Sequence, residues 1–330
     1  MCGISGKYKP HEGSIDPGEI RQMLMQIQYR GPDESGIFIG KGIGLGCVRL
    51  SIIDLAQGQQ PMSVEEGQLW IVYNGEIFNY IELRRELEGL GYQFRPNSDT
   101  EVLLLLFRHY REECLAKLNG QFAFAIWDTR RNELFLARDR MGIRPLFYHQ
   151  SGTDFVFASE IKCLFETEYI QPELDPVSLN RAFTFWTIPS PGTLFKGVVE
   201  LPPGHYMIKG KDREVVKSYW DLDFQSRREV IATSSFENKM EELDSLISDA
   251  VRLRLRADVQ VAAYLSGGLD SSATTHMIKK IEPGVLNTFS IGFEDDEFDE
   301  TRFQEMVSSK LETDHKSVTC RRSDIATNFA

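Results

Sequence analysis

The sequence predicts two consecutive domains of different fold class, an α+β domain of antiparallel sheets sandwiched by helices and an α/β domain with a parallel sheet. From residue 2 to 222, many short apolar or alternating segments are joined by turns, with a few helices between them. From Phe236 the apolar residues follow a helical period, and short apolar segments then alternate with helices. A polar stretch that includes Arg227, Arg228 and Glu229 separates the two patterns. We therefore expect domains at 1–222 and 236–330, joined by a connector at 223–235.

Composition excludes several classes of protein. With 330 residues, 26% charged residues and a net charge of −12, the chain is unsuited to a nucleic-acid-binding surface. No apolar run approaches the ~18 residues of a membrane span, and residues 1–30 lack the pattern of a signal peptide. The five cysteines are odd in number and form no CxxC pair. We expect a cytoplasmic protein without disulfides or structural zinc, and with neither nucleic acid nor membrane as a partner.

The chain opens with Met1-Cys2-Gly3-Ile4. Once an initiator methionine is removed, a cysteine at this position carries both a thiol and a free α-amine. An α-amine titrates near ~7.7–8.0, so part of it is neutral at cellular pH and can accept the thiol proton. The resulting thiolate attacks carbonyl carbon well. Cys2 is therefore a candidate nucleophile, and the alternative from this residue alone is a small buried side chain that opens a strand.

Helix starts and stops organise the first domain. Asp16 and Glu19 are spaced as the N-cap and third residue of a capping box, and so are Ser98 and Glu101. Gly91 ends a further helix. Helices are predicted at 17–29, 80–90 and 100–110, with a turn at 30–33, and strands at 4–8, 36–41, 45–53, 69–73, 121–128, 133–138, 146–149 and 154–158.

Three further positions in this domain suggest substrate contacts. Asn74-Gly75 sits at the predicted end of a strand and precedes a helix, so an Asn amide and a Gly N–H can form an oxyanion hole. One such donor lowers a barrier by on the order of 3 kcal/mol. Arg49 lies in an apolar setting and needs an anionic partner, which a substrate carboxylate would supply. Asp99 can bind a substrate ammonium, or it acts only at the helix end.

Six motifs occur in order between residues 2 and 220: 1–4, 30–33, 49–52, 74–77, 98–101 and 138–142. Together they resemble the class II glutamine amidotransferase domain, an N-terminal-nucleophile hydrolase with an αββα four-layer sandwich. The resemblance implies that Cys2 attacks the side-chain amide of glutamine and releases ammonia, while Asn74 and Gly75 form the oxyanion hole. It also implies that glutamine is bound by Arg49, Leu50, Asn74, Gly75, Glu76 and Asp99. The stretches 30–33 and 138–142 are interpreted as architectural.

The second domain begins with an amphipathic helix at 236–255 and a short apolar strand at 259–265. The strand leads into Ser266-Gly267-Gly268-Leu269-Asp270-Ser271-Ser272 and a helix at 272–281. Strand, glycine-rich turn and helix form a phosphate cradle of backbone N–H groups, hydroxyls and a helix N-terminus. The loop lacks the Walker lysine and the GxGxxG spacing. An ordinary β–α turn explains one glycine but not the surrounding serines, and Asp270 beside phosphates suggests Mg²⁺.

Strands at 286–293 and 316–319 and a helix at 301–311 complete a β–α–β–α–β order, which predicts a right-handed parallel sheet with a nucleotide at its carboxyl edge. The loop resembles the pyrophosphate loop of N-type ATP pyrophosphatases, which cleave ATP to AMP and pyrophosphate. That resemblance implies ATP contacts at Leu265, Ser266, Gly267, Gly268, Asp270, Ser271 and Ile291.

The two domains in this order resemble glutamine-hydrolysing asparagine synthetases. The resemblance implies glutamine, aspartate and Mg-ATP as substrates, an aspartyl-AMP intermediate and an internal ammonia tunnel. The alternatives are a relative that amidates another carboxylate, and a regulator that only binds glutamine or a nucleotide. A homodimer is the expected assembly. Because the chain stops at Ala330 after three strands of the second sheet, we expect an incomplete second domain, in which case this chain is a glutaminase only. A retained Met1 would leave Cys2 without a free amine and the glutaminase inactive.

Overall fold

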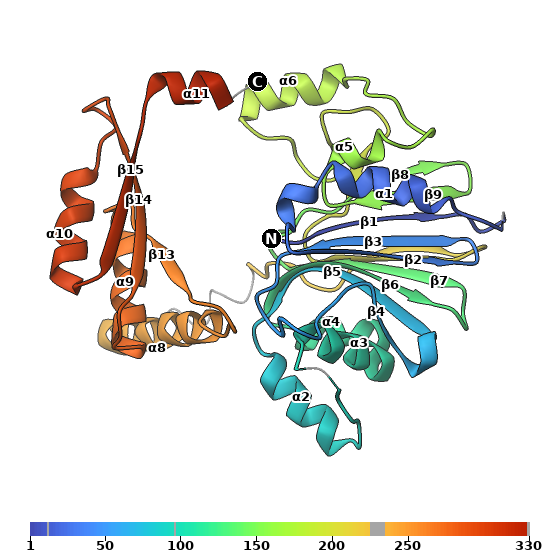
Figure 1. Ribbon diagram of the computed structural model, residues 1–330, viewed down its shortest axis with the longest axis horizontal. Helices are drawn as coiled ribbons and strands as arrows, with labels where there is room; N and C mark the ends of the chain where they lie inside the picture. The colour runs from blue at the N-terminus through green and yellow to red at the C-terminus, as the bar shows by residue number, and fades with distance from the viewer. Residues whose placement is uncertain (12, 96, 225–234, 329–330) are drawn as a thin grey trace. The chain divides into compact units, whose positions relative to one another are not determined.

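The computed structural model describes residues 1–11, 13–95, 97–224 and 235–328. The chain divides into two compact units, Met1–Asp223 and Phe224–Ala330 (Figure 1). Most of the predicted connector, residues 225–234, lies outside the described residues. The exact domain boundaries therefore stay a prediction.

The first unit contains two antiparallel sheets of six strands each (Figure 1). One sheet has the order β10 (Val199–Glu200), β8 (Phe147–Ser151), β9 (Asp154–Ala158), β1 (Gly3–Tyr8), β3 (Ile43–Arg49) and β2 (Glu34–Gly40). The other has the order β12 (Glu214–Ser218), β11 (His205–Lys209), β7 (Glu133–Arg138), β6 (Gly120–Asp128), β5 (Leu69–Ile77) and β4 (Met62–Val64).

Helices cover the outer face of each sheet. The first sheet is covered by α1 (Pro17–Met25) and α5 (Ile161–Leu164), and the second by α2 (Tyr80–Gly89), α3 (Asp99–Tyr110) and α4 (Cys114–Lys117). One apolar core lies between the sheets and includes Ile4, Leu45 and Val72, and a further core lies under each helical layer. Alternation along the strands supplies both faces of each sheet. The result is the predicted αββα sandwich.

Both predicted capping boxes are only half formed. The N-cap side chain caps the helix in each case, but the glutamate three residues later does not. Asp16 caps α1 by accepting from Gly18 N at 2.8 Å, but Glu19 pairs with Lys7, whose side chain is 1% exposed. A buried ammonium needs a counter-ion, and this requirement outweighs the local cap. Helix α1 also ends at Met25, four residues before the predicted end, and a 3-10 turn at Gln28–Arg30 follows.

The second glutamate departs from its predicted cap in the same way. Ser98 caps α3 through Thr100 N at 3.1 Å, whereas Glu101 accepts from Arg95 N at 3.2 Å. The pattern also missed α6 (Pro176–Phe185), although Asp175 accepts from Val177 N and a proline opens the helix. The short elements α4, α5, β4 and β10 carry too few periodic residues to be predicted, and β11 and β12 were missed as well.

Strand β5 runs to Ile77, so Asn74, Gly75 and Glu76 lie within the strand and not at its end as predicted. They pair with Ala123, Phe122 and Gln121 of β6. This pairing between distant segments prolongs the strand, and sequence periodicity does not report it. Strand β3 conversely stops at Arg49, before the predicted end at 53.

The second unit contains a three-stranded parallel sheet in the order β13 (Ala262–Tyr264), β14 (Asn287–Phe293) and β15 (Asp314–Cys320). This confirms the predicted sheet. Its helices are α8 (Phe236–Arg254), α9 (Leu269–Ile281), α10 (Thr301–Leu311) and α11 (Arg322–Asn328). Helix α9 starts three residues earlier than predicted, which places Asp270 and Ser271 in its first turn. Among the residues that the structure describes, no helix is long and apolar enough to cross a membrane.

Candidate active site

The seven residues predicted to act on glutamine line one small cavity of about 50 Å³ in the first unit. They come from the segment before β1, the end of β3, the middle of β5 and the start of α3. The lining residues are Met1, Cys2, Arg49, Leu50, Ile52, Ile53, Gln60, Tyr73, Asn74, Gly75, Glu76, Asp99, Thr100 and Arg144. The strand pairing therefore brings together side chains that are up to 97 positions apart between Cys2 and Asp99.

Cys2 is held by its backbone while its thiol faces the cavity. Arg30 Nε donates to the Cys2 carbonyl at 3.0 Å, and the Cys2 Sγ lies 3.7 Å from Leu50 O. Arg30 is in turn paired with Glu160 at 2.8 Å. Burial raises the pKa of the Cys2 thiol, so the thiolate does not form without a nearby base. Partial burial also lowers the pKa of the α-amine of Met1, the N-terminal residue in the structure.

Asn74 is fully buried, and neither its Oδ1 nor its Nδ2 has a hydrogen-bond partner among the described residues. An unpaired buried amide costs about 1–3 kcal/mol, so its presence here points to a ligand that completes it. At the next residue, a Cβ on Gly75 would lie 2.1 Å from Gln121 O, so no larger residue fits. The pair therefore presents the side-chain amide of Asn74 next to a backbone position, Gly75, that carries no side chain.

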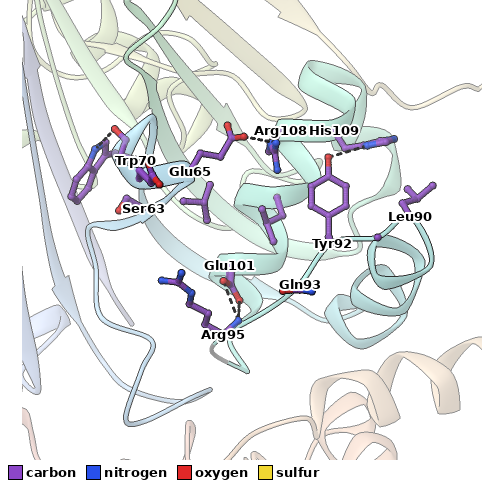
Figure 2. A pocket seen from close by; sticks show the side chains of 15 residues that line it. Ser63, Glu65, Trp70, Leu90, Tyr92, Gln93, Arg95, Glu101, Arg108 and His109 are labelled. Atoms are coloured by element: carbon purple, nitrogen blue, oxygen red, sulfur yellow. Dashed lines mark hydrogen bonds and ion pairs between the residues drawn. The ribbon is translucent and has the colours of Figure 1, made fainter.

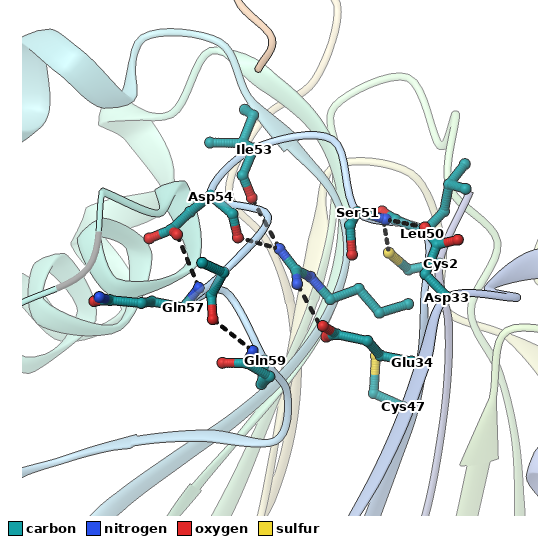
Figure 3. A network of polar contacts seen from close by, with 12 residues as sticks. Cys2, Asp33, Glu34, Cys47, Leu50, Ser51, Ile53, Asp54, Gln57 and Gln59 are labelled. Carbon is teal, nitrogen blue, oxygen red and sulfur yellow. Dashed lines mark hydrogen bonds and ion pairs between the residues drawn. The ribbon is translucent and has the colours of Figure 1, made fainter. Parts of the chain in front are cut away.

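The Arg49 guanidinium is 5% exposed and already has internal partners, namely Glu34, Ile53 and Asp54, which are labelled in Figure 3. Its Nη1 pairs with Glu34 at 3.0 Å, and its Nη2 donates to Ile53 O at 2.9 Å and to Asp54 O at 2.8 Å. Glu34 thus supplies part of the negative charge that we expected from a substrate. The Nε and the second Nη1 hydrogen have no protein partner in the part of the chain that is described, and they remain for a ligand.

Asp99 lies at the start of α3, where it is 5% exposed. Its Oδ2 accepts from Tyr73 Oη at 3.0 Å and from Ile77 N at 3.1 Å. Burial raises the pKa of the Asp99 carboxyl to about 6, and these two hydrogen bonds oppose that rise. A ligand ammonium in the cavity would favour the ionised form of this carboxyl.

Sequence reasoning missed four polar neighbours of these residues. Tyr73 contacts Asp99, Gln60 accepts from Tyr73 N at 2.6 Å, and Glu34 pairs with Arg49. Arg144 lines the cavity two residues after the 138–142 motif, and that motif was the available signal. Glu34 follows directly after the 30–33 turn, but only the pairing of β2 with β3 places it opposite Arg49.

A larger cavity of about 870 Å³ lies elsewhere in the first unit and shares no residue with the one at Cys2 (Figure 2). It is bounded by β4 and by the segments around α2 and α3. Its polar side chains largely pair with one another, as Arg108 does with Glu65 and Tyr92 Oη with His109 Nδ1 at 3.1 Å. It contains no cysteine, so size alone does not locate the chemistry.

In the second unit, the predicted phosphate loop joins the end of β13 to the start of α9. The Ser266 Oγ and Ser271 Oγ lie 2.9 Å apart, and Gly268 N donates to Ser266 Oγ at 3.3 Å. Gly267 has φ +88, and a Cβ there would lie 2.8 Å from Phe303 Cβ. Glycine is therefore needed at this position. The loop presents hydroxyls and N–H groups at a helix N-terminus, which suits a phosphate.

The remaining nucleotide positions differ in accessibility. Leu265 is 1% exposed and bonds through its backbone to Phe289 O at 2.9 Å, whereas Ile291 on β14 is 56% exposed. Within the described ranges, no cluster of three or more His, Cys, Asp or Glu residues could hold a metal ion. Asp270 is thus not part of a metal cage made by the protein alone.

Comparison with known proteins gives two family matches. Residues 1–220 match the family described as glutamine amidotransferase domain, and residues 242–330 match the asparagine synthase family. The chain is 40% identical over 316 residues to asparagine synthetase [glutamine-hydrolyzing] 1 of Bacillus subtilis, covering 94% of this chain and 49% of that protein. It is 35% identical over 339 residues to a putative asparagine synthetase [glutamine-hydrolyzing] 2 of Methanocaldococcus jannaschii, covering 96% of this chain and 64% of that protein.

The chain therefore spans about half the length of the Bacillus subtilis relative. Among solved structures, the allosteric regulatory enzyme of purine biosynthesis aligns with a TM-score of 0.50 and 22% identity, covering 67% of this chain and 50% of that one. At this identity the likeness concerns the fold alone.

Proposed function

The chain belongs to the class II glutamine amidotransferases that also carry an asparagine synthase domain, and from this premise we propose that the whole protein is a glutamine-dependent asparagine synthetase. The observation that carries the proposal is the convergence of seven predicted residues on one cavity around Cys2. The phosphate loop in a separate parallel-sheet unit supports a second reaction centre that uses ATP.

In the glutaminase reaction, the N-terminal amine of Cys2 accepts the thiol proton as Sγ bonds to the side-chain carbonyl carbon of glutamine. The Asn74 amide and the Gly75 N–H donate to the oxygen that becomes negative. The proton then passes to the leaving nitrogen as the C–N bond breaks, which releases ammonia and leaves a thioester. Water hydrolyses the thioester to glutamate. This sequence requires that Met1 has been removed.

Two charged side chains hold the glutamine for this attack. The free N–H groups of Arg49 bind the α-carboxylate, and the buried Asp99 carboxylate binds the α-ammonium, with Leu50 and Glu76 completing the cavity wall. A bound glutamine zwitterion would give the unpaired N–H groups an acceptor. It would also place a positive charge beside the Asp99 carboxylate, whose pKa burial raises.

In the second unit, Ser266, Gly267, Gly268 and Ser271 bind the pyrophosphate part of ATP, and Leu265 and Ile291 flank the adenosine. Asp270 would hold a Mg²⁺ ion, which would supply positive charge at the phosphates when bound. The aspartate carboxylate attacks the α-phosphorus of ATP, which forms aspartyl-AMP and releases pyrophosphate. Ammonia from the first unit then displaces AMP to form the amide. The single acidic side chain at the loop is consistent with a metal held largely by the nucleotide.

The proposed organisation is a glutaminase domain at 1–222, a connector at 223–235 and a synthetase domain from 236. The division of the chain into compact units at Asp223 supports it. We also propose that the protein acts in the cytoplasm, since all five of its cysteines are free.

AMP release by the product of the complete reading frame tests the function. Glutamine and Mg-ATP are supplied with aspartate, glutamate, D-aspartate or a β-amino acid as acceptor. We expect one AMP and one glutamate for each asparagine formed, and at most a slow background with the other acceptors. Faster AMP release with another carboxylate would identify a different amidotransferase and contradict the proposal.

The affinity for glutamine should depend on pH through Asp99. Its ionised form binds the ammonium, and its pKa in the folded protein is about 6, so binding is intact above this pH and is lost as pH falls through it. We expect the KM for glutamine to rise about tenfold for each pH unit below about 5.5. In Asp99→Asn the KM should be raised at every pH and the steep region should disappear. A wild-type KM that stays constant from pH 7 to pH 5 would contradict the assignment.

Gly267→Ala should impair only the ATP reaction. The added Cβ meets Phe303 and the left-handed backbone strains it, so the loop must shift away from its phosphate-binding geometry. We expect AMP formation to fall on the order of tenfold or more, as a misplaced anion site loses at least one charge-assisted hydrogen bond of about 1.5–3 kcal/mol. Gly284→Ala, where the added methyl has no neighbour within 4 Å, is the matched control. If both substitutions changed the rate of AMP formation equally, the loop around Gly267 would not be the phosphate-binding site.

A further inference from the structure

Arg144 lies at the cavity of Cys2 but has no part in the steps above. It is 9% exposed, its Nε is buried without a hydrogen-bond partner among the described residues, and its Nη1 contacts the sulfur of Met1. A thioether is a weak acceptor and does not satisfy a guanidinium. A buried cation with so little compensation is costly and is usually tied to a ligand or a reaction.

The backbone of Arg144 is fixed by the turn that begins at Arg138. The carboxylate of Asp139 accepts from Phe122 N at 3.1 Å, Ile143 N at 2.9 Å and Arg144 N at 3.0 Å. Arg138 Nε donates to Arg144 O at 2.7 Å. The turn that was interpreted as architectural therefore fixes the backbone from which the Arg144 side chain reaches Met1.

The N-terminal amine lies among several charges. In the structure this is the amine of Met1: burial lowers its pKa, and the positive charges of Arg144 and Arg30 lower it further, while the Cys2 thiolate and Glu76 oppose them. Removing Met1 transfers the amine to Cys2, whose carbonyl Arg30 already holds at 3.0 Å. The charged and titratable groups around this position and the adjacent thiol are then Arg30, Arg49, Glu76, Asp99, Arg144 and Cys2 itself.

We propose that Arg144 is a positioning residue for glutamine hydrolysis, whose guanidinium stands beside the N-terminus and keeps the Cys2 amine in its neutral, proton-accepting form. The inference rests on the proposed glutaminase function. A second positive charge close to a guanidinium is disfavoured at the low dielectric of a buried cavity, so the amine accepts the thiol proton at a lower pH than it otherwise would. Once the amine has taken that proton, the same repulsion favours its transfer to the leaving ammonia.

The test compares the pH dependence of kcat in Arg144→Met and Arg144→Lys with that of the wild type, each with Met1 removed as verified by intact mass. Saturating glutamine removes the contribution of Asp99 to binding. In Arg144→Met we expect the midpoint of the acidic fall in kcat to move to a pH about 0.5–1 unit higher, while the maximal kcat at high pH is retained. Arg144→Lys keeps the charge and should follow the wild type. Arg140→Met is the matched control, because Arg140 is exposed and bonds to Ala116 O at 3.2 Å.

A second readout does not depend on catalysis. In protein labelled with ¹⁵N at cysteine, the terminal amine of Cys2 is titrated directly by its nitrogen chemical shift, in wild type and in Arg144→Gln. An amine pKa that rises in Arg144→Gln supports the inference, and an unchanged pKa overturns it, even for a variant with no activity. A wild type that has lost Met1 and yet releases no glutamate would instead refute the proposed function and leave the amine titration to decide the role of Arg144.

Discussion

Cys2→Ala is expected to abolish glutamine hydrolysis, with a fall in glutamate release of at least about 10⁴-fold, because Cys2 supplies the only thiol among the described residues that line the cavity. Ammonia-dependent amide formation by the complete protein should be retained, since the loop that we propose for adenylation lies in the other unit. Both rates are measured on the same preparation, with glutamine or an ammonium salt as the nitrogen donor.

Cys320→Ala is the control for loss of a thiol, because Cys320 ends β15 in the second unit and is remote in sequence from the glutaminase motifs. We expect it to leave glutamate release unchanged. If Cys2→Ala removed ammonia-dependent synthesis together with glutamine hydrolysis in a folded protein, the proposal of two separate reaction centres would be wrong.

Asn74→Ala should separate activity from stability. In the proposed mechanism the side chain donates to the developing oxyanion, so its loss should lower kcat by about 10²–10³-fold, as removal of one oxyanion donor does elsewhere. In the free protein the same amide is buried with no hydrogen-bond partner among the described residues, so the free energy of unfolding should fall by no more than about 1 kcal/mol. Glutamate release and urea unfolding check the two halves.

Asn79→Ala is the matched control, with the opposite expected effects on stability and on kcat. Asn79 lies outside the cavity, and its side chain donates to Lys117 O at 3.0 Å and accepts from Asn119 N at 3.0 Å. We expect this variant to lose stability and to keep its kcat. A variant at Asn74 with near-normal kcat, or one destabilised as strongly as Asn79→Ala, would contradict the role of Asn74 as an oxyanion donor.

The features that the sequence predicted well are those encoded by neighbouring residues. The alternation of β13, α9, β14, α10 and β15 is a local pattern, and it led directly to the parallel sheet. The N-terminal Cys2 and the Asn74-Gly75 pair were recognised because their chemistry is unusual for their positions.

The features that the sequence did not predict depend on contacts between distant segments. Glu19 is drawn to the buried Lys7, so its helix cap is lost. Strand β5 is prolonged by β6, and Glu34 meets Arg49 because β2 and β3 pair in the register that places them opposite each other. That last contact matters for the site, since it shows that Arg49 is charge-compensated before any substrate binds.

The central claim is that the Cys2 amine is the base for its own thiol, and the sharpest test relates activity to the state of Met1. Samples prepared with and without methionine aminopeptidase are analysed by intact mass, and glutamate release is measured on the same material. The rate should be proportional to the fraction that has lost Met1 and should vanish where Met1 is fully retained. Undiminished glutamate release by protein that retains Met1 would contradict the mechanism.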